Sequence, residues 1–288
     1  MTKEEFQKLC TKTVLLDGAT GSNLIAAGMP QGVSSELWVL EHPDVIHQLQ
    51  SAYVEAGSQI IYAPTFGANR ITLTRHGLED RIQELNRTLV QYAKESADGK
   101  ALVAGDVTTT GQLMEPLGDL TYETVFSTYQ EQISLWAEAG ADLIVAETMI
   151  HIGETCAALE AAHSVCDLPV MCSMTVDANG NIFTGGNILE AAAKLEAAGV
   201  DAVGINCSVG PEQLEKIVRD IRRTVSIPVL AKPNAGMPVV LADGQTTYPM
   251  KPDAFAQHMK TLAARGATLL GGCCGTAPAF IAALKQNL

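Results

Sequence analysis

Aromatic side chains are scarce in this sequence: phenylalanine, tryptophan and tyrosine make up 5% of its 288 residues, although 47% are hydrophobic. The apolar content is therefore mostly aliphatic and alanine-rich, which is typical of helices packed on a parallel sheet. A chain of this length is long enough for one large core or for two small domains.

Basic residues are also few, with 19 lysines and arginines against 32 acidic residues and a formal net charge of -13. Such a surface repels nucleic-acid phosphates and anionic lipids, so we expect neither partner.

No run of eighteen apolar residues occurs, and the start "MTKEEFQKLC" lacks the apolar core of a signal peptide. We therefore expect a cytoplasmic protein. Thr2 and Glu5 have capping-box spacing, which predicts a short helix over about residues 2–10.

Three kinds of motif are missing as well. No glycine-rich dinucleotide fingerprint and no Walker motif is present, which argues against an open, doubly wound nucleotide-binding sheet. None of the six histidines stands in an Asp-x-His-x-x-Gly cobalamin motif.

Seven cysteines in a reducing compartment are unsuited to a disulfide framework, so metal binding, catalysis or burial must account for them.

What the sequence does have is a series of short apolar runs, each followed by a small or polar residue. Segments with helical periodicity separate them, which predicts parallel strands that are buried on both faces. The runs are "TVLLDG" at 13, "SQIIYAPT" at 58, "ALVAGD" at 101, "ADLIVAET" at 141, "LPVMCSMT" at 168, "DAVGINCS" at 201, "IPVLAKPN" at 227 and "ATLLGGCC" at 267.

A hinge repeats before every second run: "EAGSQII", "EAGADLI", "AAGVDAV" and "ARGATLL". In each of them a glycine stands between a helix end and a strand, where a left-handed C′ residue is favoured. These glycines are Gly57, Gly140, Gly199 and Gly266. Eight strands in such a repeat predict an α/β fold, a closed (β/α)8 TIM barrel forming a single domain over residues 1–288.

Barrel enzymes carry their active sites at the C-terminal ends of the strands. The residues at those ends are Asp17, Thr65, Asp106, Glu147, Thr175, Cys207, Asn234, Cys273 and Cys274. Three thiols therefore meet at one rim, which describes a zinc site with one open position. Inert buried thiols and a redox-active vicinal pair are the alternatives. The other cysteines, which are Cys10, Cys156, Cys166 and Cys172, are interpreted as small buried hydrophobes.

Three thiolates with Zn²⁺ carry a net charge of -1, so the ion is a poor Lewis acid for hydrolysis. It would still bind a fourth thiol as thiolate near neutral pH and keep that sulfur nucleophilic. Alkyl transfer to a thiol is the reaction that fits such a site. Gly271 and Gly272 would let the chain leave strand geometry so that both vicinal thiols face one ion.

Seven segments together resemble the homocysteine S-methyltransferase family, and within it most closely the N-terminal homocysteine-binding barrel of cobalamin-dependent methionine synthases. They are "LLDGATGSNL", "PTFGANR", "RHGLED", "AET", "GINCSVGPE", "KPNAG" and "LGGCCGTAP". The resemblance extends from about Val14 to Phe280 and implies a zinc-dependent methyltransferase with Cys207, Cys273 and Cys274 as the metal ligands.

The same resemblance implies the contacts of the substrate, homocysteine. Asp17 and Glu147 match positions that hold its ammonium, and the backbone N–H groups of Gly18 and Ala19 would meet its carboxylate. The other two positions that line the pocket by resemblance are Thr65 and Phe66. The side-chain oxygen of Asn234 would fill the open zinc position until substrate arrives.

The methyl donor implied by the resemblance is methylcobalamin, carried by a separate corrinoid protein or by another module of a longer protein. S-methylmethionine and S-adenosylmethionine remain alternatives. Betaine is disfavoured, because Gly67 and Thr148 stand where betaine-using relatives carry aromatic residues, and Trp38 is the one aromatic candidate nearby.

Two rival functions stay open. A barrel aldolase would use Lys232, at the seventh strand end, as a Schiff-base amine. The "GG" loop at Gly271 and Gly272 would be its phosphate-binding site. A non-catalytic subunit would bind and activate homocysteine for a partner enzyme without turning it over.

Overall fold

The computed structural model describes residues 1–241 and 246–288, and within them eight parallel strands form a closed barrel. Their hydrogen-bonded order is β1-β10-β7-β6-β5-β4-β3-β2, and a parallel bridge between Leu16 and Ile60 joins the two ends. The strands are β1 (Val14–Leu15), β2 (Ile60–Tyr62), β3 (Leu102–Val107), β4 (Leu143–Met149), β5 (Val170–Met174), β6 (Ala202–Asn206), β7 (Val229–Lys232) and β10 (Ala267–Leu270). The predicted (β/α)8 barrel and its eight strands are confirmed.

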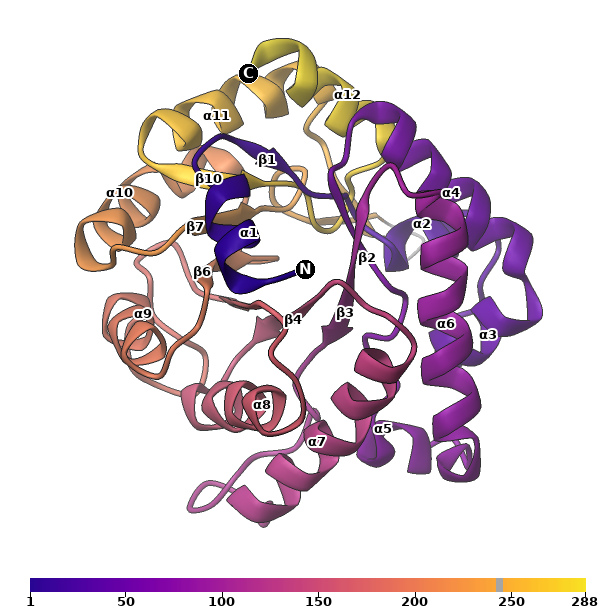
Figure 1. Cartoon of the computed structure of the whole chain (residues 1–288). Coiled ribbons are helices and arrows are strands. Elements are labelled where there is room, and N and C mark those ends of the chain that lie inside the picture. Colours follow the sequence, from indigo (N-terminus) through magenta and orange to yellow (C-terminus); the bar gives the residue numbers. More distant parts are fainter. Residues whose placement is uncertain (242–245) are drawn as a thin grey trace.

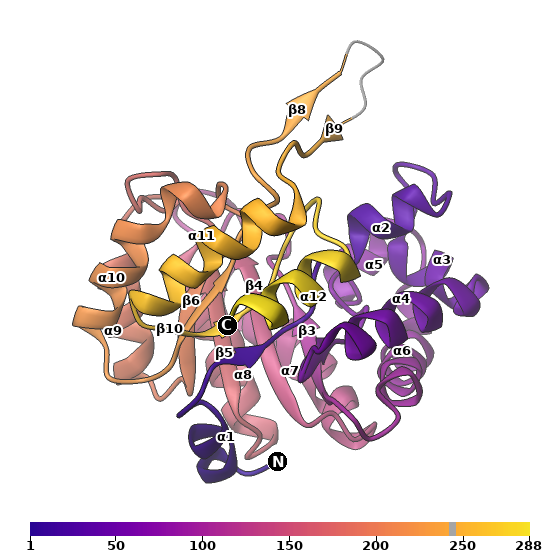
Figure 2. The ribbon, with the colours of Figure 1, turned by 90° about the horizontal axis from the view of Figure 1, so that it is seen from above.

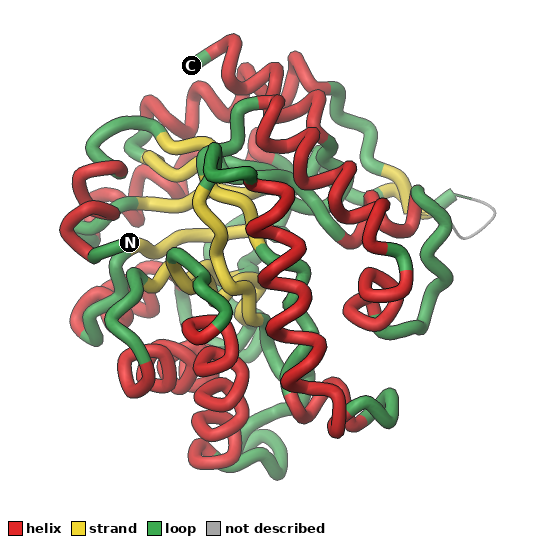
Figure 3. Tube along the Cα trace, turned by 45° about the vertical axis from the view of Figure 1, so that its right-hand side comes forward, coloured by secondary structure: helices red, strands yellow, loops and turns green. Residues whose placement is uncertain are grey.

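Helices surround this barrel on the outside (Figures 1 and 3). The outer ring comprises α4 (Pro43–Ala56), α6 (Ile82–Ala97), α7 (Tyr122–Glu138), α8 (Ile152–Val165), α9 (Ile188–Ala197), α10 (Glu215–Thr224), α11 (Pro252–Ala264) and α12 (Pro278–Asn287). Shorter helical segments are α1 (Lys3–Leu9), α2 (Gly21–Ala26), α3 (Ser35–Glu41), α5 (Arg70–Thr74), and the 3₁₀ turns at Glu79–Arg81 and Pro211–Gln213. Among the described residues, none of the helices is both long and apolar enough to cross a membrane.

The repeated glycine hinge has the conformation that the sequence predicted. Gly57, Gly140, Gly199 and Gly266 have φ values of 120°, 85°, 89° and 104°. This region is costly for side chains with a Cβ atom, so glycine ends each helix and turns the chain into the next strand.

The N-terminal helix α1 covers one mouth of the barrel (Figures 1 and 2). Its predicted capping box is present, because Thr2 Oγ1 accepts from the Glu5 N–H and Glu5 Oε2 accepts from the Thr2 N–H. Phe6 is fully buried against inward-facing barrel residues such as Leu16 and Leu143. This mouth is therefore sealed, and the opposite one remains for a site.

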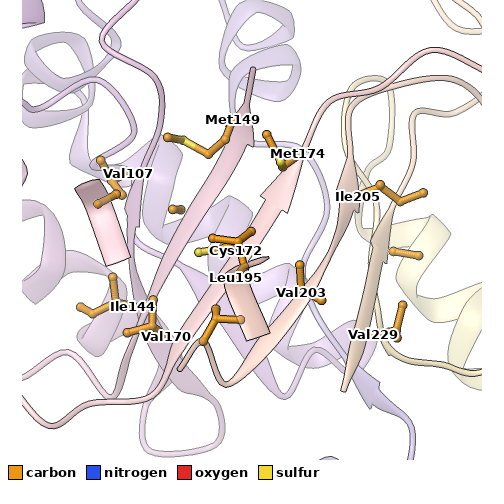
Figure 4. Close-up of a cluster of buried hydrophobic side chains, with 14 of the residues drawn as sticks. Val107, Ile144, Met149, Val170, Cys172, Met174, Leu195, Val203, Ile205 and Val229 are labelled. Atoms are coloured by element: carbon orange, nitrogen blue, oxygen red, sulfur yellow. The ribbon is translucent and has the colours of Figure 1, made fainter. Parts of the chain in front are cut away.

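A second apolar layer lies between the strands and the outer helices, where Val170, Met174 and Leu195 pack together with Cys172 (Figure 4). Cys172 is completely buried there, and burial raises the pKa of its thiol. Cys10 is buried at the end of α1, while Cys156 and Cys166 are half-buried. These four cysteines occupy the structural positions expected for small hydrophobes.

The sequence analysis did not anticipate two local features. Residues Pro211–Gln213 form a 3₁₀ turn before α10, which starts only at Glu215. Between β7 and α11 two very short strands, β8 (Val239–Val240) and β9 (Thr246–Thr247), pair antiparallel and project from the barrel (Figure 2). Strands of two residues leave no hydrophobic periodicity by which a sequence could announce them.

Candidate active site

A cavity of about 220 Å³ is lined by residues at the C-terminal ends of the strands. Figure 2 shows α1 at the opposite end of the barrel. The walls of the cavity include Phe66, which is 38% exposed, and all three rim cysteines. Four ionisable side chains form its floor, which are Asp17, Asp106, Glu147 and Lys232. The cavity is smaller than clefts that take drug-sized ligands, which begin at roughly 300 Å³, so it suits a small amino acid.

The three rim thiols converge on one point. Their sulfur atoms all lie within 4.8 Å of one another, and Cys207 Sγ is 3.6 Å from Cys274 Sγ. Tetrahedral zinc with Zn–S bonds of about 2.3 Å holds its sulfur ligands about 3.8 Å apart. Cys207, Cys273 and Cys274 therefore fit a zinc ion as a set of three ligands with one position left open.

Backbone geometry aims these thiols. Cys207 has φ 57°, a left-handed conformation that is rare and costly for a residue with a side chain. Its N–H donates to the Lys232 carbonyl at 3.1 Å, and the Cys273 N–H donates to the Pro233 carbonyl at 2.8 Å. Both cysteine-bearing segments are thus tied to β7 and its end, which lie between them in the barrel.

The glycines before the cysteine pair serve close packing. A Cβ atom on Gly271 would lie 2.6 Å from the Asp17 carbonyl oxygen, and one on Gly272 would lie 2.5 Å from Thr276. The Gly272 N–H donates to that same Asp17 carbonyl at 3.0 Å. A side chain at either position would push the thiols away from the end of β1.

The thiols also act on one another electrostatically. Hydrogen bonds from Cys207 and Cys273 lower the pKa of the Cys274 thiol far below its usual range, while the pKa of Cys273 is raised by hydrogen bonds within the same group. Three sulfur atoms that converge at one rim also form a soft ligand set of the kind that zinc prefers.

An ion pair lies at the base of the cavity. Lys232 Nζ is 2.9 Å from Asp17 Oδ1 and 3.7 Å from Glu147 Oε2, and it stands 3.5 Å above the centre of the Tyr62 ring. Burial acts to lower the pKa of Lys232, but the carboxylates of Asp17 and Glu147 outweigh it and raise that pKa well above its usual value. Lys232 is therefore a fixed cation.

Asp106 and Glu147 form a second pair on the floor. Their carboxyl groups are near enough for each to affect the pKa of the other. Burial, followed by the charge of Glu147, raises the pKa of Asp106 well above its usual range. Burial likewise raises the pKa of Glu147, although Lys232 opposes the shift. Burial therefore disfavours the ionised form of both carboxyl groups.

Only some of the other residues predicted to contact the substrate line the cavity. Thr65 is fully buried and does not line the cavity; its hydroxyl bridges to the backbone of Asp106. Gly18 and Ala19 line the cavity, but the Ala19 N–H donates to Thr276 Oγ1 at 3.1 Å. The side-chain nitrogen of Asn234 donates to the Cys207 carbonyl, while its buried Oδ1 has no partner among the described residues.

The sequence matches a model of the homocysteine S-methyltransferase family over residues 14–288. The chain belongs to this family. Membership confirms the resemblance inferred from the seven sequence segments.

Curated relatives include methionine synthases from Mycobacterium tuberculosis and Mycobacterium leprae, which are 32% and 31% identical over 95% and 96% of this chain. The chain spans 24% of the length of either relative. The structure of the homocysteine methyltransferase MmuM from Escherichia coli in its metallated form matches with a TM-score of 0.81 and 25% identity, over 96% of both chains.

Two functional features of this family member were missed by sequence reasoning. Asn206 is fully buried: its Oδ1 accepts from Ser173 Oγ and the Thr148 N–H, both at 2.8 Å, while its Nδ2 reaches Glu147 Oε2 at 3.4 Å and Cys273 Sγ at 3.9 Å. It thereby links the thiols to the acidic floor. Its position just before Cys207, at a strand end, was the available signal.

The second missed residue is Tyr248, which follows β9. Its ring packs against Gly275, where an added Cβ atom would lie 2.3 Å from the ring. A hydrogen bond from the Tyr248 hydroxyl also contributes to the lowered pKa of Cys274. Tyr248 does not follow a barrel strand, so the strand-end argument that found the cysteines gave no signal for it.

Proposed function

We propose that this homocysteine S-methyltransferase family member binds zinc through Cys207, Cys273 and Cys274 and methylates homocysteine to methionine. The observation that carries the proposal is the convergence of three thiols beside a buried acidic floor in one small cavity. A thiol-binding centre next to an ammonium-binding floor matches the two ends of an aminothiol.

The three sulfur ligands support zinc in this role, because a catalytic zinc site keeps one coordination position open. The buried Asn234 Oδ1 has no partner among the described residues and is a candidate for the fourth ligand before substrate binds. When bound, zinc supplies a fourth coordination position that keeps the homocysteine sulfur as a nucleophilic thiolate near neutral pH.

The protein's own residues orient the substrate. Acidic groups on the floor, Glu147 among them, attract the substrate ammonium by charge-assisted hydrogen bonds. Gly18 and Ala19 line the wall where the substrate carboxylate would lie, and Gly18 packs so closely that a Cβ atom there would lie 2.6 Å from the Tyr53 hydroxyl oxygen. Holding the ammonium and carboxylate of homocysteine would leave its sulfur facing the opening of the cavity. A methyl donor would approach the sulfur from that side.

Methyl transfer forms one bond from sulfur to carbon and breaks the bond that carries the methyl group in the donor. The homocysteine thiol gives up its proton to solvent on binding, so the sulfur attacks as an anion, and the electron pair of the broken bond stays with the demethylated donor. Phe66 stands at the wall of the cavity and helps to exclude water from the attacking sulfur.

A methylcobalamin-bearing corrinoid protein, or a corrinoid module of a longer chain, is the donor that we propose. Large apolar side chains are exposed in several segments that follow barrel strands: Ile25, Val33, Phe66, Leu113, Leu117, Phe183, Met237, Val239, Val240 and Leu241. Exposed apolar side chains in segments that follow the strands are compatible with a protein partner at this end of the barrel. The cavity itself has no room for a corrinoid.

Other readings have less support. S-methylmethionine and S-adenosylmethionine are small sulfonium donors that would reach the same sulfur without a partner. A Schiff-base aldolase needs a neutral lysine, but Lys232 is held as a cation between Asp17 and Glu147. A betaine cage is not supported either, because Trp38 stacks on His42 and does not line the cavity.

The test is to measure zinc content after reduction, and then methionine formation from homocysteine with methylcobalamin and S-methylmethionine in parallel. One zinc per chain with turnover on either donor is expected, and the active donor selects the branch. Zinc and homocysteine binding without turnover would favour the homocysteine-activating subunit. Absence of zinc from carefully reduced protein would refute the proposed site.

A further inference from the structure

We propose that Asn206 is the positioning residue of the three-cysteine site: it anchors the strained turn from which Cys207 presents its thiol, and it holds Thr148 beside that turn. The inference rests on the proposed function, because it concerns the aim of a thiol at zinc. Asn206 itself is completely buried and is not among the residues that line the cavity, so it would act through its neighbours.

Cys207 lies at the tip of a three-residue turn. Its φ is 57°, and the Ser208 N–H donates to the Asn206 carbonyl at 2.7 Å, from one side of Cys207 to the other. A hydrogen bond from residue i+2 to residue i around a central residue with positive φ is typical of the rarer, strained form of the γ-turn. Such a conformation persists only where the surrounding structure holds it. The direction of the Cys207 thiol therefore depends on what anchors the turn.

The backbone carbonyl of Asn206 is the first anchor. Besides the Ser208 N–H, it accepts from Ser208 Oγ at 3.0 Å and from Thr175 Oγ1 at 3.3 Å. Ser208 Oγ in turn accepts from the Val176 N–H at 2.9 Å. The residues that follow β5 thus hold the far side of the turn against the end of β6.

The side chain of Asn206 is the second anchor. Its Oδ1 accepts from Ser173 Oγ on β5 and from the Thr148 N–H near the end of β4, both at 2.8 Å. A backbone N–H can only donate, so this bond fixes which end of the amide is the oxygen. Nδ2 then donates to Thr148 Oγ1 at 2.7 Å and lies 3.9 Å from Cys273 Sγ. One amide therefore ties the ends of three neighbouring strands together.

Thr148 depends on the same amide, which binds both its N–H and its hydroxyl. Its φ is also 57°. Among the described residues other than glycine, positive φ values occur at Asp98, Thr148 and Cys207. Asp98 ends helix α6, where a left-handed residue is common, whereas Thr148 and Cys207 line the cavity. Two strained residues that share one buried anchor are the observation that carries the inference.

Loss of the Asn206 side chain would leave buried donors without an acceptor and would free both strained residues to relax. The Cys207 thiol would then turn away from Cys273 and Cys274, although all three sulfurs are still present. Partners that orient metal ligands typically contribute about 10- to 100-fold to metal affinity. We expect a loss of that size.

The experiment measures zinc affinity by chelator competition in reduced wild type, Asn206→Ala and Asn86→Ala. Asn86 is the matched control, because it is also completely buried and does not line the cavity. Its side chain is hydrogen-bonded to Trp136, Ala68 and Ile82. Urea unfolding should show that both variants are destabilised, but only Asn206→Ala should bind zinc about 10- to 100-fold more weakly.

Two further readouts separate positioning from general loosening. Cobalt(II) in place of zinc gives thiolate-to-metal charge-transfer absorption, which should be weaker in Asn206→Ala than in the wild type. Ser173→Ala removes one donor to Asn206 Oδ1 and should weaken zinc binding less than Asn206→Ala does. The double variant should bind zinc no more weakly than Asn206→Ala alone, since Ser173 acts through the same amide.

Unchanged zinc affinity and cobalt absorption in folded Asn206→Ala would overturn the inference and leave the proposed zinc site standing. An equal loss of zinc affinity in Asn86→Ala would also overturn it, because loosening of the fold would then explain both. Wild type that binds no zinc after reduction would refute the proposed function itself. Asn206→Ser supplies a second variant if Asn206→Ala fails to fold, and circular dichroism checks both.

Discussion

Lys232 and Asp17 form a buried ion pair at the base of the cavity, with Nζ 2.9 Å from Oδ1 and side chains that are 3% and 2% exposed. They are 215 positions apart in sequence, and the barrel brings the end of β7 beside the end of β1. The aldolase hypothesis treated Lys232 as a nucleophile, whereas its contacts make it a counter-ion.

Replacing Lys232 by methionine should destabilise the protein by about 3–5 kcal/mol, because it strands a buried carboxylate. Urea unfolding at neutral pH measures the change. The double variant K232M/D17N should be less destabilised than the two single variants would add up to. As a control, Lys100→Met breaks the exposed pair with Asp98 and should leave the free energy of unfolding nearly unchanged. A neutral K232M would contradict the ion-pair assignment.

Cys207→Ala should lose zinc and methionine formation together, because two thiolates bind the ion much more weakly than three. Metal analysis of the purified, reduced protein reads out the zinc. Cys156→Ala, in α8, is the matched control and should keep one zinc per chain. Full activity in Cys207→Ala would show that the ligand set is wrong.

Glu147→Gln should weaken homocysteine binding about 10- to 100-fold while zinc stays bound, since it removes a charge-assisted partner of the substrate amine. Calorimetric titration of the zinc-loaded variant gives the affinity, and metal analysis runs alongside. Zinc loss in this variant would mean that the links from Glu147 through Asn206 to Cys273 hold the metal ligands in place.

Asp106 should make the zinc-free protein less stable as pH rises. Burial raises its folded pKa, so between about pH 4 and that raised value the folded state holds a proton that the unfolded chain has lost. The free energy of unfolding then falls with pH. Asp106→Asn should flatten this decline by up to about 1.4 kcal/mol per pH unit, as measured by urea unfolding from about pH 4.5 to 7.5. Identical slopes would argue against a raised pKa.

Gly140→Ala should destabilise the fold by about 1 kcal/mol, because φ is 85° there and an added Cβ atom meets nothing within 4 Å. The cost is then purely conformational. Gly140→Asn is the control and should cost less, since asparagine tolerates the left-handed region. Thermal unfolding of the two variants separates them, and equal losses would exclude the conformational explanation.

Much of the site could be predicted from strand ends. Once the eight runs were interpreted as parallel strands, Cys207, Cys273 and Cys274 had to lie on one rim, because the C-terminal ends of all barrel strands meet there. What the strand ends could not reveal was which polar groups engage each other. Asp17 turned out to be engaged by Lys232, and Asp106 to lack a donor among the described residues.

By itself, the sequence determined the barrel, its hinge glycines, its N-terminal cap and the three clustered thiols. These features follow from local periodicity, from the φ that glycine alone tolerates cheaply, and from a topology with one active rim. Tertiary structure alone decided how charge is shared on the floor among Asp17, Asp106, Glu147 and Lys232. Those pairings depend on distances of a few ångströms between strands and on burial, which raises the free energy of every unpaired charge.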